Sequence, residues 1–142
     1  MLTGTTIAAL APGRGAVITG GASGIGLATA RQLAVLGMRF CIADRDRDAL
    51  RAAEIELASV APNGPIDVVA VETDVSSVSD IDRLAATAFD RFDDIALLMN
   101  NAAAFQGGDA LWDSDGWRRL MDECFGRALW CSAHRSRHDR SR

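Results

Sequence analysis

The segment GAVITGGASGIGL, residues 15–27, constrains the fold more than any other part of the sequence. It begins with apolar residues, and Val17 and Ile18 are β-branched, as is typical of a strand covered on both faces. Gly20, Gly24 and Gly26 then allow the chain to turn sharply and bring bare backbone close to a ligand. Apolar residues at helical spacing follow as far as Gly37, which is typical of a helix end. The segment therefore predicts a strand, a glycine turn and a helix, in that order.

The glycine turn also indicates a binding site. Residues 19–26 have the spacing T-G-x-x-x-G-x-G, and a helix that begins after such a turn presents free N–H groups and a positive dipole end, which suit a phosphate. A glycine turn can also be only a tight connection. Here a strand precedes it, a helix follows it and an acid ends the next predicted strand, so a phosphate-bearing cofactor is favoured.

Three further units, each a strand followed by a helix, are expected along the chain. Each predicted strand is a short apolar run, and each predicted helix carries apolar residues at helical spacing. Short strands that alternate with amphipathic helices imply right-handed crossovers and a parallel sheet. We therefore expect the α/β class and one doubly wound domain over residues 15–131. Strands are predicted over residues 16–19, 38–43, 66–73 and 95–99, and helices over residues 24–36, 47–60, 80–91 and 114–131.

The ends and connections of these elements have weaker signals. Ser77 or Ser79 is expected to cap the third helix, and the Pro-Asn-Gly-Pro cluster at residues 62–65 is expected to be a turn. Residues 1–14 are interpreted as a lead-in with little structure. Residues 132–142 are almost without apolar side chains, so we expect a disordered basic tail.

Charge and cysteine content limit the partners and the compartment. The net charge is −4 at pH 7, and the basic excess is confined to the last eleven residues, so nucleic-acid binding is not expected. The three cysteines contain no C-x-x-C pair, which argues against a disulfide framework. Because no apolar run is long enough to span a bilayer and no signal peptide is evident, we expect no membrane partner and a cytoplasmic location.

Asp44 bears on the choice of cofactor. It lies eighteen positions after Gly26, near the spacing of an acid that binds a ribose diol, and its carboxylate would repel a 2′-phosphate. NAD is therefore favoured over NADP. Arg45 and Arg47 lie close enough to accommodate a phosphate, so NADP stays the alternative. Asp44 can also be interpreted as one of several solvated loop acids.

With these residues in view, the chain resembles the N-terminal, cofactor-binding part of a classical short-chain dehydrogenase/reductase. The resemblance rests on the glycine motif of residues 19–26, Asp44, Asp74-Val75 and Asn100-Asn101-Ala102. It implies a Rossmann-like sheet, incomplete at about four strands, and a protein that uses NAD(H) or NADP(H) to oxidise alcohols or reduce carbonyls.

The resemblance also implies a set of cofactor-binding residues. Asp74 would contact the adenine edge, and Asn100, Asn101 and Ala102 would line the cofactor and hold the fourth strand. Without the resemblance, Asp74 is better interpreted as a helix-capping acid and the asparagines as turn residues. The complete candidate set is Thr19, Gly20, Ser23, Gly24, Ile25, Gly26, Asp44, Arg45, Asp74, Val75, Asn101 and Ala102.

The chain departs from the family's pattern at the positions that carry the chemistry. Ala103 stands where the family has glycine, and the family usually has an asparagine near Cys124. The family's proton transfer uses a serine and a Tyr-x-x-x-Lys pair, whereas this sequence has no Tyr, and all fifteen of its basic residues are Arg. We therefore expect a truncated, cofactor-binding half with no catalytic residue, inactive alone, whose full-length relative would act on a small alcohol or carbonyl.

Two other functions stay open. The chain could be a non-catalytic NAD-binding or interaction module that self-associates through the free edge of the fourth strand and the helix after it. It could also be a frameshifted remnant without a selected function. Cys131, His134 and His138 have a spacing found in metal sites, but chance histidines in a tail are the better interpretation, and no metal site is expected.

Overall fold

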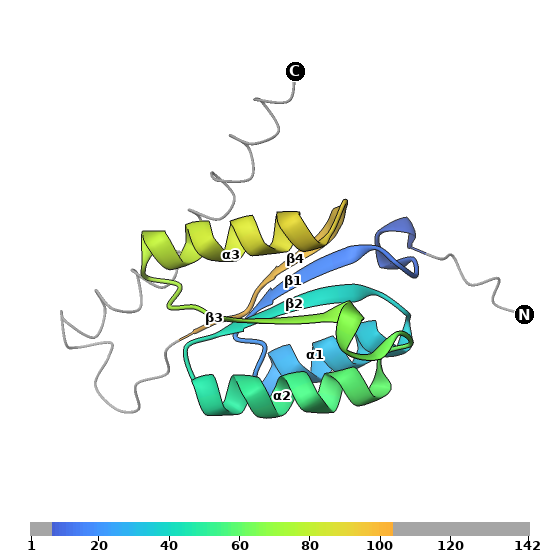
Figure 1. Ribbon diagram of the computed structural model, residues 1–142, viewed down its shortest axis with the longest axis horizontal. Helices are drawn as coiled ribbons and strands as arrows, with labels where there is room; N and C mark the ends of the chain where they lie inside the picture. Colours follow the sequence, from blue (N-terminus) through green and yellow to red (C-terminus); the bar gives the residue numbers. More distant parts are fainter. Residues whose placement is uncertain (1–6, 104–142) are drawn as a thin grey trace, which may run out of the picture.

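A four-stranded parallel sheet organises the part of the chain that the structure, a computed structural model, describes, namely residues 7–103 (Figure 1). Its strand order is β3-β2-β1-β4, with every neighbouring pair parallel. The predicted parallel α/β sheet is therefore confirmed. The elements are η1 (Ala8–Leu10), β1 (Gly15–Thr19), α1 (Gly24–Val35), β2 (Arg39–Asp44), α2 (Arg47–Val60), η2 (Gly64–Asp67), β3 (Val68–Glu72), α3 (Val78–Arg91) and β4 (Ile95–Asn100).

Helices cover both faces of the sheet, as a doubly wound fold requires. Helices α1 and α2 lie on one face and α3 on the other (Figure 1). All five residues of β1 are buried, and alternate residues of the strand face opposite layers: Ile18 packs with the α1 and α2 side and Val17 with the α3 side. The apolar, β-branched run that predicted a strand covered on both faces is thus the centre of the core.

Helix α1 ends at the glycine that the sequence indicated. Gly37 has φ +77°, a left-handed conformation that favours glycine. Its N–H donates to the carbonyl of Ala34, and the N–H of Met38 donates to the carbonyl of Leu33. These two bonds form a complete Schellman motif, which satisfies carbonyls that the helix end would otherwise leave unpaired.

Helices α2 and α3 begin at side-chain caps. The Asp46 carboxylate accepts hydrogen bonds from the N–H groups of Asp48 and Ala49, and the Ser77 hydroxyl accepts one from the N–H of Asp80. Of the two serines proposed for the third helix, Ser77 is therefore the cap. The helix starts two residues earlier than predicted, at Val78.

The third strand is shorter than predicted because η2 takes its first residues. Asp67 is only 1% exposed, and its carboxylate accepts hydrogen bonds from the backbone N–H and the side-chain amide of Asn63. This local closure makes a 3-10 turn of Gly64–Asp67, so β3 begins at Val68. The predicted helix at residues 114–131 and the tail at residues 132–142 lie outside the described residues.

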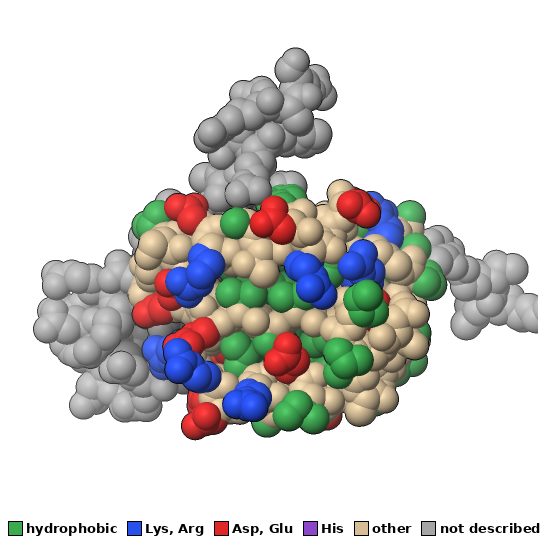
Figure 2. Space-filling model, in the orientation of Figure 1, with side chains coloured by type: hydrophobic (Ala, Val, Ile, Leu, Met, Phe, Trp, Pro, Cys, Tyr) green, Lys and Arg blue, Asp and Glu red, His purple; other side chains and the backbone are tan. Residues whose placement is uncertain are grey.

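The described surface is mixed in charge. Figure 2 shows acidic and basic side chains interspersed on the face that carries α2, β3 and α3. Ion pairs join neighbouring elements there, as Arg47 of α2 does with Glu72 of β3, at 2.6 Å. Between residues 7 and 103, no helix has the length and apolar character needed to cross a membrane.

Candidate functional site

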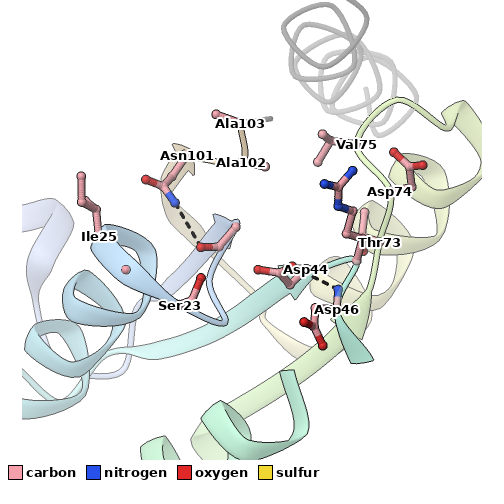
Figure 3. Close-up of a pocket in the computed structure, with 13 residues that line it drawn as sticks. Ser23, Ile25, Asp44, Asp46, Thr73, Asp74, Val75, Asn101, Ala102 and Ala103 are labelled. Carbon is pink, nitrogen blue, oxygen red and sulfur yellow. Dashed lines mark hydrogen bonds between the residues drawn. The ribbon is translucent and has the colours of Figure 1, made fainter. Parts of the chain in front are cut away.

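A cavity of about 450 Å³ opens where the carboxyl ends of the four strands meet (Figure 3). Strand β1 pairs with β2 on one side and with β4 on the other, so the strand order reverses there. Ligands of open α/β sheets bind at such switch points. The wall consists of Gly20, Ser23, Gly24, Ile25, Asp44, Arg45, Asp46, Thr73, Asp74, Val75, Asn101, Ala102 and Ala103.

The structure brings ten of the twelve candidate residues into this wall. The two others, Thr19 and Gly26, lie behind the glycine turn and support it. Asp46, Thr73 and Ala103 line the wall without having been candidates. Thr73 directly follows the end of β3, and Asp46 lies in the short loop between β2 and α2. Position close after a strand end was therefore the signal that could have found them.

Gly26 allows α1 to approach the turn closely. A Cβ added at Gly26 would lie 2.1 Å from the carbonyl oxygen of Gly20 and 2.7 Å from the side-chain nitrogen of Asn101. Two features exclude a larger residue than glycine at position 20: Gly20 has φ +65°, and a Cβ there would lie 2.9 Å from the Cα of Ala102. Both glycines are therefore required by the packing of the turn.

Thr19 and Asn101 join the end of β4 to the glycine turn. The Thr19 side chain is almost fully buried, and its Oγ1 accepts hydrogen bonds from the N–H groups of Asn101, at 3.1 Å, and Ala102, at 3.2 Å. The Asn101 amide in turn donates to the carbonyl of Gly20, at 3.1 Å (Figure 3). The segment after β4 is thus held against the turn, beside the cavity.

The N-terminus of α1 is left without a side-chain cap from Ser23, and no acid stands in its first turn. By contrast, α2 and α3 each have both a capping side chain and an acid in the first turn. Free N–H groups beside bare glycine backbone suit an anionic group such as a diphosphate. The exposed side chain of Ile25 adds an apolar surface at the same edge of the cavity.

Acidic side chains dominate the opposite wall. Asp44, partly buried at the end of β2, lies between the glycine turn and the loop before α2 (Figure 3). Asp46 and Asp74 also line the wall, together with Arg45. Arg47, which the sequence analysis considered for a phosphate, is absent from the wall and pairs with Glu72 instead.

The loop that carries Asp74 is fixed by hydrogen bonds at its backbone and its side chain. The N–H of Asp74 donates a hydrogen bond to the Asp80 carboxylate. This bond lowers the pKa of Asp80, and Arg83 lowers it further, whereas burial acts in the opposite direction. The Asp74 carboxylate accepts hydrogen bonds from the N–H and the hydroxyl of Ser76. Asp74 therefore closes the loop before α3 and lines the cavity as well, whereas the cap of that helix is Ser77, so the helix-capping interpretation of Asp74 is wrong.

The substitution at Ala103 causes no backbone strain. No residue other than glycine has a positive φ in the described stretch, residues 7–103. In the same stretch, no group of three His, Cys, Asp or Glu side chains is arranged to hold a metal ion. The Cys131, His134 and His138 spacing lies outside it.

Comparisons with known proteins agree with this geometry. The family model described as short chain dehydrogenase matches residues 14–141. A 1-deoxy-11-beta-hydroxypentalenate dehydrogenase of Streptomyces exfoliatus is 42% identical over 103 residues, which cover 70% of this chain and 35% of that protein. The chain thus spans about a third of the length of this curated relative.

Solved structures of short-chain dehydrogenases resemble most of this chain, and the chain covers about half of their length. A short-chain dehydrogenase/reductase from Burkholderia phymatum in complex with NAD superimposes with a TM-score of 0.76 at 33% identity, covering 86% of this chain and 43% of that one. A glucose/ribitol dehydrogenase-type structure from Brucella melitensis gives a TM-score of 0.77 at 28% identity, covering 87% and 51%.

Proposed function

The chain belongs to the short-chain dehydrogenase family, whose members bind a nicotinamide dinucleotide, and we propose that it binds NAD in the cavity at the carboxyl ends of its strands. The observation that carries the proposal is the glycine turn. Its bare backbone and the uncapped start of α1 form one wall of the cavity. In the proposed complex the diphosphate lies against the residues of the turn that line the cavity, namely Gly20 and residues 23–25.

The rest of the wall gives each other part of NAD a partner. Asp44 accepts hydrogen bonds from the adenosine ribose, and Asp74 and Val75 lie along the adenine. Asn101 and Ala102 border the path towards the nicotinamide. The proposal assigns Thr19 and Gly26 to the support of the turn, because neither lines the cavity.

The charges of the wall support NAD rather than NADP. The Asp44 carboxylate would face a 2′-phosphate, and Asp46 and Asp74 add negative charge to the same wall. Arg45 also lines this wall, whereas Arg47 is paired with Glu72. A carboxylate at the end of the second strand disfavours that phosphate. We expect NAD to bind at least about tenfold more tightly than NADP, a difference of about 1.4 kcal/mol.

Isothermal titration of the 142-residue chain with NAD and with NADP tests this proposal. Asp44→Ala is expected to reduce the preference for NAD, and Asp48→Ala is the matched control, since Asp48 is an exposed acid of the same segment outside the wall. Binding of NADP as tight as that of NAD would contradict the choice of cofactor. Failure of both nucleotides to bind would contradict the site.

We further propose that this chain alone does not turn over. Family resemblance assigns proton transfer to a Tyr-x-x-x-Lys pair, and the 142 residues contain neither residue type. In a full-length relative, the bound cofactor would exchange a hydride with a small alcohol or carbonyl. Steady formation of reduced nicotinamide by the purified chain with a panel of small alcohols, with contaminating enzymes excluded, would contradict the proposal.

Self-association is a second candidate function, and the position of β4 favours it. Within residues 7–103, β4 is at one edge of the sheet, and none of its six residues is fully buried, although the strand reads Ile-Ala-Leu-Leu-Met-Asn. Apolar edge strands invite pairing with another chain. Light scattering tests this candidate, and a stable monomer at high concentration would contradict it.

A further inference from the structure

The Asp44 carboxylate contacts two separate pieces of backbone. Its Oδ2 accepts a hydrogen bond from the N–H of Ala22, at 3.2 Å, and its Oδ1 accepts one from the N–H of Asp46, at 3.2 Å. Ala22 belongs to the glycine turn, twenty-two residues earlier in the chain, whereas Asp46 is the cap of α2. One side chain therefore joins the phosphate-facing turn to the loop after β2.

The bond to Ala22 completes the attachment of the turn to β2. The N–H of the preceding residue, Gly21, donates to the carbonyl of Ala43, at 3.1 Å. Two consecutive amides of the turn are thus held by the end of β2, the first by main chain and the second by a side chain. Ala22 is 6% exposed and directly precedes Ser23 and Gly24, both of which line the cavity. A shift of Ala22 would therefore move the wall that faces the diphosphate.

We propose that Asp44 is a positioning residue, which holds the glycine turn in place, as well as a ligand of the ribose. A carboxylate has about four acceptor sites on its two oxygens. The two backbone bonds occupy one site on each oxygen, so each oxygen keeps a site for one hydroxyl of the ribose diol. This inference rests on the proposed function, because it extends the role of Asp44 in the same site from the ribose to the diphosphate.

Amide hydrogen exchange tests the attachment without any ligand. In the Asp44→Ala variant, exchange at Ala22 is expected to rise about tenfold or more relative to the parent chain, as expected for the loss of a hydrogen bond to a charged acceptor. The Gly21 amide keeps its bond to the Ala43 carbonyl and is expected to keep its protection. Unchanged exchange at Ala22, or an equal rise at both amides, would overturn the inference.

Two nucleotides separate the two roles of Asp44 in binding. ADP has both the diphosphate and the ribose diol, whereas 2′,3′-dideoxyadenosine 5′-diphosphate keeps the diphosphate and the adenine but lacks the two hydroxyls of the diol. If Asp44 positions the turn, Asp44→Ala weakens the binding of both nucleotides. Its affinity for the dideoxy compound is then expected to fall by about tenfold. Asp48→Ala is expected to leave both affinities within about twofold, and it controls for the loss of one negative charge.

The outcomes distinguish this inference from the proposed function. A loss of affinity for ADP alone, with the dideoxy nucleotide bound equally by parent and variant, would overturn the positioning role and leave the cofactor site intact. Failure of the parent chain to bind either nucleotide would contradict the proposed function, and amide exchange at Ala22 would then decide the attachment by itself.

Discussion

Replacing Gly26 by alanine is expected to destabilise the domain by about 3 kcal/mol and to weaken NAD binding by about a hundredfold or more. The added methyl group would lie 2.1 Å from the Gly20 carbonyl oxygen, and a backbone atom cannot move aside without displacing the turn. The start of α1 must therefore separate from the glycine turn. Urea unfolding measures the change in stability, and isothermal titration measures the change in affinity.

Gly24→Ala is the informative control for this substitution. Gly24 lies in the same turn with φ +52°, but apart from its chain neighbours and the nearby backbone of α1 itself, no atom of the described residues lies within 4 Å of an added Cβ. Alanine there is expected to cost only about 1 kcal/mol, from the left-handed backbone. Equal losses of stability in the two variants, or a Gly26→Ala protein as stable as the parent chain, would contradict the close approach of α1 to the turn.

Replacing Thr19 by valine is expected to reduce the free energy of unfolding by about 2–4 kcal/mol. Valine keeps the shape and the β-branch but removes Oγ1, which accepts the N–H groups of Asn101 and Ala102 in a site that is 1% exposed. Both donors lose that acceptor while they remain partly buried. Because the segment after β4 then loosens beside the cavity, NAD affinity should fall as well.

Two further variants isolate the hydroxyl of Thr19. Thr19→Ser keeps the acceptor and is expected to retain most of the stability that Thr19→Val loses. Thr87→Val removes a hydroxyl from α3 that donates to the Arg83 carbonyl one turn earlier in the same helix, and should change stability by less than about 0.5 kcal/mol. A Thr19→Val protein as stable as the Thr87→Val protein would show that Thr19 does not hold the segment after β4.

Elements with strong local signals were predictable from the sequence. Helix α2 was predicted over residues 47–60 and has those bounds, because Asp46 caps its start and Pro62 follows its end. The glycine turn was equally clear, since its spacing, the strand before it and the helix after it agree. Consistency between local and global signals makes such predictions reliable.

Features that depend on tertiary contacts were not predictable. Ile66 resembles the start of a strand, but the buried Asp67 closes onto Asn63 and places Ile66 in a 3-10 turn. Arg47 was considered for a phosphate because it is near Asp44 in sequence, yet its partner is Glu72, twenty-five residues away. The register of neighbouring strands decides that pairing, and no local pattern specifies it.

The candidate site also has features that the sequence predicts and features that only the structure shows. The motif identified the residues of the turn, but it did not reveal that Thr19 and Gly26 lie behind the cavity wall. Nor did it reveal that Asp44 bonds to the Ala22 amide, because that contact forms only when β1 and β2 pair in parallel. Sequence spacing thus located the site, whereas the division of roles within it required the structure.

The central claim is that the glycine turn binds the diphosphate of a nicotinamide dinucleotide. Its most direct test is a titration of the isotope-labelled 142-residue chain with NAD, followed through the backbone amide resonances. We predict that the largest shifts occur at the amides of residues 20–26, with smaller shifts at Asp44 and Asp74. Shifts confined to other parts of the chain, or no shifts at saturating NAD, would contradict the claim.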